Sequence, residues 1–119
     1  MQMSAALMRS AVVLALLCCE AHAAAVLSEA QARAKAIAIL KGDPYGNSAK
    51  EISDNLKGVQ LIAAGVDNCS KARVRGPVWQ FHIVVPKEKM KDGNSPIDGY
   101  LVLDGRSGKM LCAGLPFLD

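Results

Sequence analysis

Few residues of this chain have the types and spacing that catalysis requires. The sequence holds two histidines, His22 near the N-terminus and His82 in an apolar stretch. A nucleophile needs a base and an orienting group within hydrogen-bond reach, and no serine or cysteine is placed to be the evident partner of His82. We therefore predict no catalytic residues and a protein that is not an enzyme.

Metal and cofactor sites lack ligands in the same way. Zinc and copper need several cysteine or histidine ligands, and the cysteines beyond the N-terminal segment are expected to form a disulfide, which leaves only His82 and the thioethers of Met90 and Met110. Calcium needs six to eight oxygen ligands, and Asp104 supplies a single carboxylate to its loop. We expect no metal and no cofactor.

The segment Gly105-Arg106-Ser107-Gly108-Lys109 faintly resembles a phosphate-binding loop. It lacks the first glycine at the required spacing, and Met110 stands where serine or threonine would coordinate magnesium. Strand-forming residues 100–103 precede it and an apolar run follows. Two closely spaced glycines and the turn-capping Asp104 therefore predict a β-hairpin.

The N-terminus has the pattern of a secretory signal peptide. Arg9 is followed by the apolar block 11–17 and then by Ala21-His22-Ala23, a small-x-small cleavage motif. This predicts cleavage after Ala23, a domain over residues 24–119 and a periplasmic or secreted location. The alternative is lipidation at Cys18 or Cys19, although the residue before each is not small.

Signal cleavage leaves two cysteines, Cys69 and Cys112. An even number in an oxidising compartment predicts a disulfide, the alternative being two free thiols. The bond would close a long loop, for which chain-entropy arguments give a stabilisation of roughly 4 kcal/mol.

The charge is mildly positive, with a formal value of +3. Two cationic clusters repeat at a spacing of two, and we expect each to be a solvated face or loop. Few aromatic residues accompany them, which argues against nucleic acid as a partner. The clusters are Lys71, Arg73 and Arg75, and Lys87, Lys89 and Lys91.

Two helices are predicted. Ser28 and Gln31 form a capping box before an alanine-rich helix that runs to Leu40, with Gly42 as its C-cap. A second capping box, beginning at Ser48, predicts a short helix over 49–56. The apolar stripe expected on the first helix consists of Ala30, Ala34, Ile37 and Leu40, with Ala38 beside them.

Strands are predicted over 59–66 and 78–85, with a polar loop over 67–76 between them. Period-two alternation in the second strand separates two faces. Trp79, Phe81, Ile83 and Val85 form a core face. Val78, Gln80, His82 and Val84 form a mixed face, which suits contact with water or a partner.

In this order the elements resemble the PepSY domain, a small exported module also found in propeptides of thermolysin-like peptidases. The resemblance covers most of residues 26–113 and rests on the order of elements. The chain departs from the family by its cysteine pair and by the long charged loop between Val85 and Tyr100. The matching residues are Ala30, Ala34, Trp79, Tyr100, Val102, Asp104 and Gly108.

The resemblance implies an α+β fold, an N-terminal helix packed on a three- to four-stranded antiparallel sheet. It also implies a non-catalytic module that binds or inhibits a peptidase, with a protein or peptide as partner. The alternative is a homodimeric structural or sensing module of the cell envelope without a peptidase target.

Both faces of the strand near residue 100 are apolar, which suggests an interaction surface on the face that one helix leaves uncovered. The alternative is burial of that face under the short second helix and the tail 115–118. The predicted partner surface consists of Val78, Gln80, His82, Val84, Leu101 and Leu103.

Overall fold

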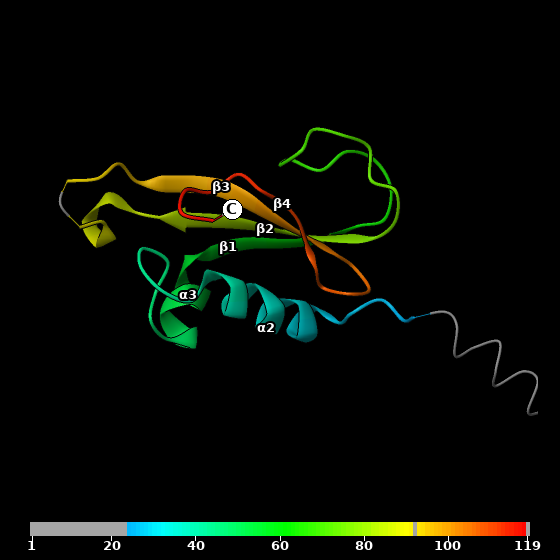
Figure 1. The fold of residues 1–119 in the computed structure, drawn as a ribbon, viewed down its shortest axis with the longest axis horizontal. Coiled ribbons are helices and arrows are strands. Elements are labelled where there is room, and N and C mark those ends of the chain that lie inside the picture. Colours follow the sequence, from blue (N-terminus) through cyan, green and yellow to red (C-terminus); the bar gives the residue numbers. More distant parts are fainter. Residues whose placement is uncertain (1–23, 92, 119) are drawn as a thin grey trace, which may run out of the picture.

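The computed structural model describes residues 24–91 and 93–118, and the predicted signal peptide lies outside this part of the chain. Within these residues, two α-helices and a four-stranded antiparallel sheet form the α+β fold that the sequence predicts (Figure 1). The sheet order β1-β2-β3-β4 follows the chain. The elements are α2 (Glu29–Leu40), α3 (Ala49–Asn55), β1 (Leu56–Ile62), β2 (Val78–Val85), the 3-10 turn η1 (Lys87–Lys89), β3 (Ile97–Asp104) and β4 (Met110–Ala113).

The predicted capping box at the start of α2 is present. The Gln31 N–H donates to the Ser28 hydroxyl over 3.1 Å, and the Ser28 N–H donates to the Gln31 side chain over 2.9 Å. The two bonds satisfy N–H groups that a helix start leaves without intrahelical partners.

The predicted apolar stripe of α2 is wrong for most of its members. The buried positions are Ala32, Ala36 and Leu40, with Ile37 partly buried. Alanine occupies every second position from 30 to 38, so two faces of the helix are equally apolar. Packing on the sheet therefore decides which face is buried, not the local pattern. The exposed members of the prediction are Ala30, Ala34 and Ala38.

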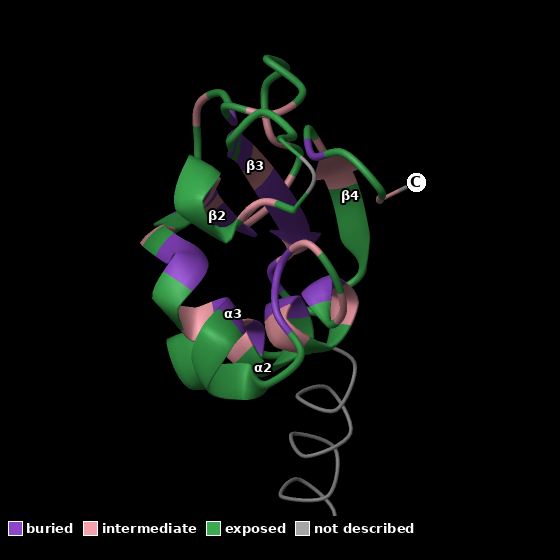
Figure 2. Ribbon diagram, turned by 90° about the vertical axis from the view of Figure 1, so that its left-hand side faces the viewer, coloured by how far each residue is buried: buried purple, intermediate pink, exposed green. Residues whose placement is uncertain are grey.

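The main core lies between the helices and one face of the sheet, where Figure 2 shows the buried residues gathered. The predicted core face of β2 is confirmed, with Phe81, Ile83 and Val85 fully buried. Trp79 belongs to this layer, and its indole N–H donates to the Leu27 carbonyl over 3.0 Å, which ties the segment before α2 to the sheet.

Strand β1 starts and ends earlier than predicted. It follows α3 directly at Leu56, with a register shift between Leu56 and Gly58, and it stops at Ile62. Residues 63–66 leave the sheet, because the chain turns at Gly65, whose φ of 104° suits glycine.

No helix in the described part of the chain has the length and apolar character to cross a membrane.

Candidate binding surface

The sheet has a second face, which neither helix covers. Figure 1 shows α2 and α3 on one side of the sheet and residues 63–77 on the other. Cross-strand pairing places alternate residues of β2 and β3 together on this second face. They are Val78, Gln80, His82 and Val84 from β2, and Asp98, Tyr100, Val102 and Asp104 from β3.

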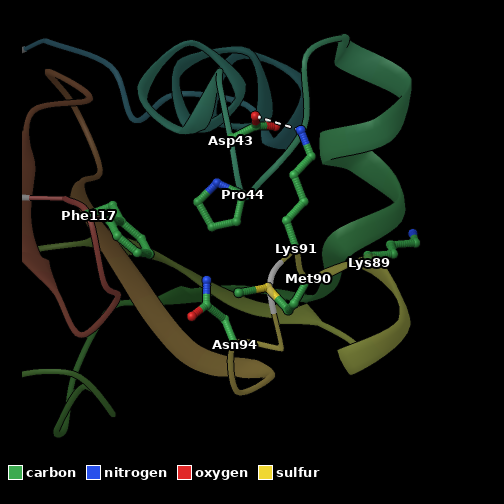
Figure 3. Close-up of a pocket in the computed structure, with 7 residues that line it drawn as sticks. All are labelled: Asp43, Pro44, Lys89, Met90, Lys91, Asn94 and Phe117. Carbon is green, nitrogen blue, oxygen red and sulfur yellow. Dashed lines mark hydrogen bonds and ion pairs between the residues drawn. The ribbon is translucent and has the colours of Figure 1, made fainter.

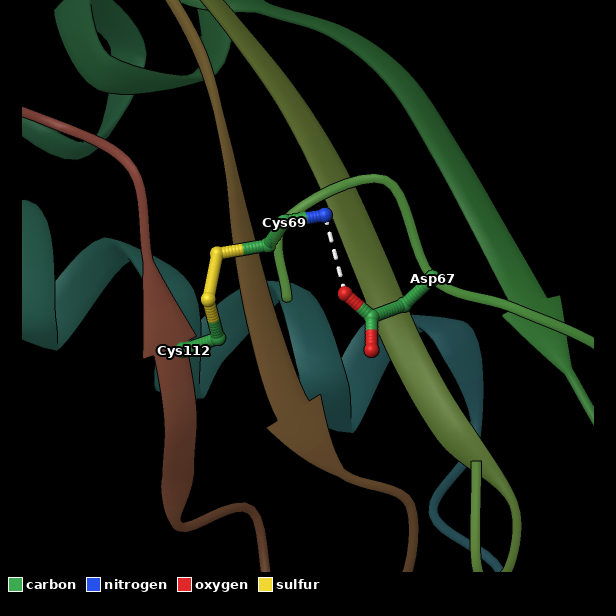
Figure 4. Close-up of side chains that lie close together, drawn as sticks. All are labelled: Asp67, Cys69 and Cys112. Carbon is green, nitrogen blue, oxygen red and sulfur yellow. Dashed lines mark hydrogen bonds between the residues drawn. A yellow bond between two sulfur atoms is a disulfide. The ribbon is translucent and has the colours of Figure 1, made fainter. Parts of the chain in front are cut away.

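Residues 63–77, here called the disulfide arm, cover one end of the second face. The predicted disulfide joins Cys69 of the arm to Cys112 of β4, with 6.1 Å between their Cα atoms (Figure 4). Beneath the arm lies a small second apolar cluster. It consists of Ile62, Val78 and Val102, with Cys69, Val74 and Cys112 against them.

Asp67 organises the turn that carries Cys69. Its carboxylate accepts the N–H groups of Cys69 (2.8 Å) and Ser70 (2.6 Å) and the Ser70 hydroxyl (2.5 Å). Burial by itself would raise the pKa of Asp67, but these hydrogen bonds and the charge of Lys71 outweigh it and lower the pKa below its ordinary value. Asp67 is therefore ionised at neutral pH and held by donors of its own turn.

A groove of about 350 Å³ lies between the arm and strands β3 and β4; we call it the arginine groove. Its apolar lining includes Val74, Val78, Val102 and Leu111, and its cationic lining is Arg73 and Arg75. Leu111 is 57% exposed although it is a large aliphatic residue. Within the described ranges, neither arginine forms an ion pair or a side-chain hydrogen bond. Charge and apolar surface therefore meet in one hollow.

Asp104, at the edge of the arginine groove, forms no ion pair with these arginines. Its carboxylate accepts the N–H groups of Ser107 (2.7 Å) and Arg106 (3.0 Å) and the Ser107 hydroxyl (2.9 Å). The Ser107 N–H bond is the main cause that lowers the pKa of Asp104, against the opposing effect of burial. This turn-capping role is the one the hairpin pattern predicts.

The other end of the second face is open and polar. His82 Nε2 lies 2.5 Å from an Asp98 carboxylate oxygen, and the His82 ring stacks on Tyr100 with 4.8 Å between ring centroids. A hollow of about 220 Å³ adjoins them, bounded also by Asn68 and Gln80. Of the described residues, no serine or cysteine hydrogen-bonds His82, whose hydrogen-bond partner is Asp98.

A third hollow, of about 160 Å³, is lined by residues of the loop after β2, of the segment after α2 and of the C-terminal segment (Figure 3). Pro44, Met90 and Phe117 give it an apolar lining. Lys91 pairs with Asp43 over 3.1 Å, and Lys89 donates to Asn55 over 3.4 Å. Because both lysines already have partners, this hollow lacks the unpaired charge that distinguishes the arginine groove.

The predicted partner surface is wrong for two of its residues, Leu101 and Leu103. Leu101 pairs with Phe81 and Leu103 pairs with Trp79, which puts both leucines on the helix-covered face, fully buried. A strand that is apolar on both faces does not reveal its register, so the sequence could not assign them. Val78, Gln80, His82 and Val84 do share the second face, but Val78 and Gln80 are buried.

Sequence reasoning missed the partners of His82 and the role of the basic cluster. Strand β3 begins at Ile97, earlier than the sequence predicts, so Asp98 lies in the strand and not in the predicted loop. The pairing register of β2 and β3 places Asp98 and Tyr100 beside His82, and a local pattern does not reveal that register. Arg73 and Arg75 are exposed, as predicted for a solvated loop, yet they also line a groove.

One group of side chains in the described residues has a composition that suits a metal ion: Asp67, Cys69 and Cys112. The two sulfur atoms are joined in the disulfide and offer no thiolate, and the carboxylate is occupied by its own turn. In this oxidised form the group therefore has a structural role, since its disulfide links the arm covalently to the sheet.

Comparison with known proteins yields no relative: no family model matches the chain, and neither the curated proteins nor the solved structures contain a significant match.

Proposed function

We propose that this chain is an exported, non-catalytic module that binds a protein or peptide on the second face of its sheet. One observation carries the proposal: the face that the helices leave uncovered holds a groove with apolar walls and two arginines without ion pairs among the described residues. Such a combination is typical of recognition surfaces, because exposed apolar patches mark interaction sites and arginine is enriched at protein interfaces.

The kind of partner follows from the PepSY resemblance. Support comes from the order of the described elements, in which the capped helix α2 precedes an antiparallel sheet whose third strand ends in the Asp104 turn. The further step, that the partner is a peptidase, rests on the resemblance alone. Purified thermolysin-like peptidase, titrated with the protein, tests that step: a saturable loss of peptidase activity supports it, and full activity at excess protein removes it.

Binding on the second face is tested by capture from an envelope extract, identification of the partner and titration of the purified pair. Tyr100→Ala and Leu111→Ser change the two ends of the second face, and Lys50→Ala on α3 is the matched control on the helix side. We expect the first two to weaken binding by about tenfold or more and the control to have no effect. A partner lost only with the Lys50 variant would contradict the proposal.

A homodimeric module is the second candidate. Strand β4 is a four-residue edge strand with Met110 and Leu111 exposed, and such an edge can pair with a second copy. Sedimentation equilibrium separates the candidates: a stable dimer that binds no partner favours self-association, whereas a monomer that binds one favours the module above.

A further inference from the structure

We infer that the arginine groove takes an extended, acidic segment of a partner, in which two acidic residues stand two positions apart next to aliphatic residues. The inference rests on the proposed binding function and names the chemistry of the partner. Three features of the groove support it: the charge of the arm, the apolar walls and the spacing of the two arginines.

The arm has more positive than negative charges. Lys71, Arg73 and Arg75 stand against one carboxylate, Asp67, which is held by its own turn. Asp104, the other carboxylate lining the groove, is likewise held by Ser107 and Arg106. Among the described residues, neither Arg73 nor Arg75 forms an ion pair, so both guanidinium groups are available to a ligand, and their planar forks match a carboxylate in a two-point contact.

The walls of the groove add an apolar requirement. Val78 and Val102 are buried beneath the arm, Val74 of the arm packs against them, and Leu111 exposes over half of its surface at the rim. Apolar walls also exclude water from one side of a bound carboxylate, which strengthens its attraction to a guanidinium. A hydrophilic anion would leave Leu111 in water, whereas an aliphatic side chain next to the carboxylate would cover it.

The spacing of the arginines indicates an extended ligand. Arg73 and Arg75 are two residues apart and both line the groove, while Val74 between them packs inward. In an extended peptide, side chains at i and i+2 point the same way and lie about 7 Å apart. An extended peptide with acidic residues at i and i+2 therefore presents both carboxylates on the side that faces the arginines, with the intervening aliphatic residue directed to the other side.

The probe is a fluorescein-labelled peptide of sequence Gly-Glu-Leu-Glu-Leu-Gly, followed by fluorescence anisotropy with the full oxidised protein. We expect saturable binding that weakens steeply with added salt, and no binding of the peptide with lysine in place of glutamate. Replacement of both leucines by serine should weaken binding by about tenfold, since the aliphatic contact is lost. Absence of binding by the acidic peptide would overturn the inference.

The protein variants test the site itself. Arg73→Gln with Arg75→Gln should lower the affinity by about tenfold or more, and the exposed Leu111→Ser should lower it severalfold. The matched control is Lys41→Gln with Lys87→Gln, which removes the same charge from exposed positions outside the groove. Equal loss in both double variants would show attraction to net charge alone and would overturn the inference.

Vesicles of phosphatidylglycerol and phosphatidylcholine complete the experiment. Binding to the anionic vesicles without binding to the acidic peptide would identify a lipid surface as the ligand and overturn the inference. A partner captured from the envelope that binds the arginine variants as tightly as the wild type would leave the proposed function standing and refute this assignment of the groove.

Discussion

The backbone N–H of Asn68 donates to the side-chain oxygen of Gln80 over 2.6 Å, although the two residues are twelve positions apart in the chain. Gln80 is buried near the middle of β2, on the second face. The neighbouring residue of the arm, Cys69, carries the disulfide to β4. Two consecutive residues therefore attach the disulfide arm to two different strands, which fixes the wall of the arginine groove.

The first prediction concerns this hydrogen bond. Gln80→Leu removes the acceptor, and we expect the free energy of unfolding to fall by about 1 kcal/mol, because the exposed Asn68 N–H regains water. Amide hydrogen exchange over residues 66–74 should accelerate more than exchange in α2. The control is Gln60→Leu, its cross-strand neighbour on β1, which is exposed. Equal effects of the two substitutions would contradict the anchoring role.

The second prediction concerns the disulfide. Replacing Cys69 and Cys112 by serine opens a loop of 43 residues, for which chain-entropy arguments predict a loss of roughly 4 kcal/mol in the free energy of unfolding. The main core contains neither cysteine, so the far-UV circular dichroism of the folded variant should stay close to that of the wild type. Urea unfolding of oxidised, reduced and double-serine protein makes the comparison. A double-serine variant as stable as the oxidised wild type would contradict the prediction.

Sequence reasoning succeeded where one local pattern admits one structure. The Ser28 capping box, the alternation from Trp79 to Val85 and the Asp104 turn each combine residue type and spacing in a way that few conformations satisfy. The α+β architecture follows from these elements. The disulfide follows from the even number of cysteines after signal cleavage and from the oxidising compartment that the signal peptide predicts.

It failed where several arrangements share one pattern. The alanines of α2 fit two helix faces, and Leu101 fits either face of a strand that is apolar on both. The binding surface depends on cross-strand register and on a loop folding back over the sheet. Arg73 and Leu111 are far apart in sequence and line the same groove only because of that long-range arrangement, which local propensity does not encode.

The third prediction concerns acid stability. Hydrogen bonds from Ser107 lower the pKa of Asp104 in the folded state, so the unfolded chain takes up its proton first as the pH falls. The stabilisation is therefore complete above about pH 4, the ordinary aspartate range, and is lost below it. Asp104→Asn keeps an acceptor but does not titrate, and its unfolding free energy should decline less between about pH 5 and pH 2. An identical decline in both proteins, measured by urea unfolding, would contradict the prediction.

The fourth prediction concerns alkaline stability. Burial raises the pKa of Tyr45 to about 12, and its hydroxyl donates to the Pro116 carbonyl. The unfolded chain releases this proton near pH 10, before the folded chain does, so the free energy of unfolding should fall as the pH rises from about 10 to about 12. Tyr45→Phe should lower stability by about 1 kcal/mol at neutral pH and show a weaker alkaline decline. An unchanged alkaline decline in that variant would assign the effect to other groups.

The fifth prediction concerns close backbone contact at the β3 end. A Cβ on Gly105 would lie 2.5 Å from the Pro77 oxygen, to which the Gly105 N–H donates over 2.8 Å. Gly105→Ala must therefore separate the hairpin from the end of the arm, at a cost of about 2 kcal/mol or more. Gly76→Ala is the matched control, since its Cβ would meet nothing within 4 Å, and it should be neutral or stabilising by less than about 1 kcal/mol. Thermal unfolding of both variants decides the matter: equal melting temperatures would show that the contact at Pro77 relaxes without cost.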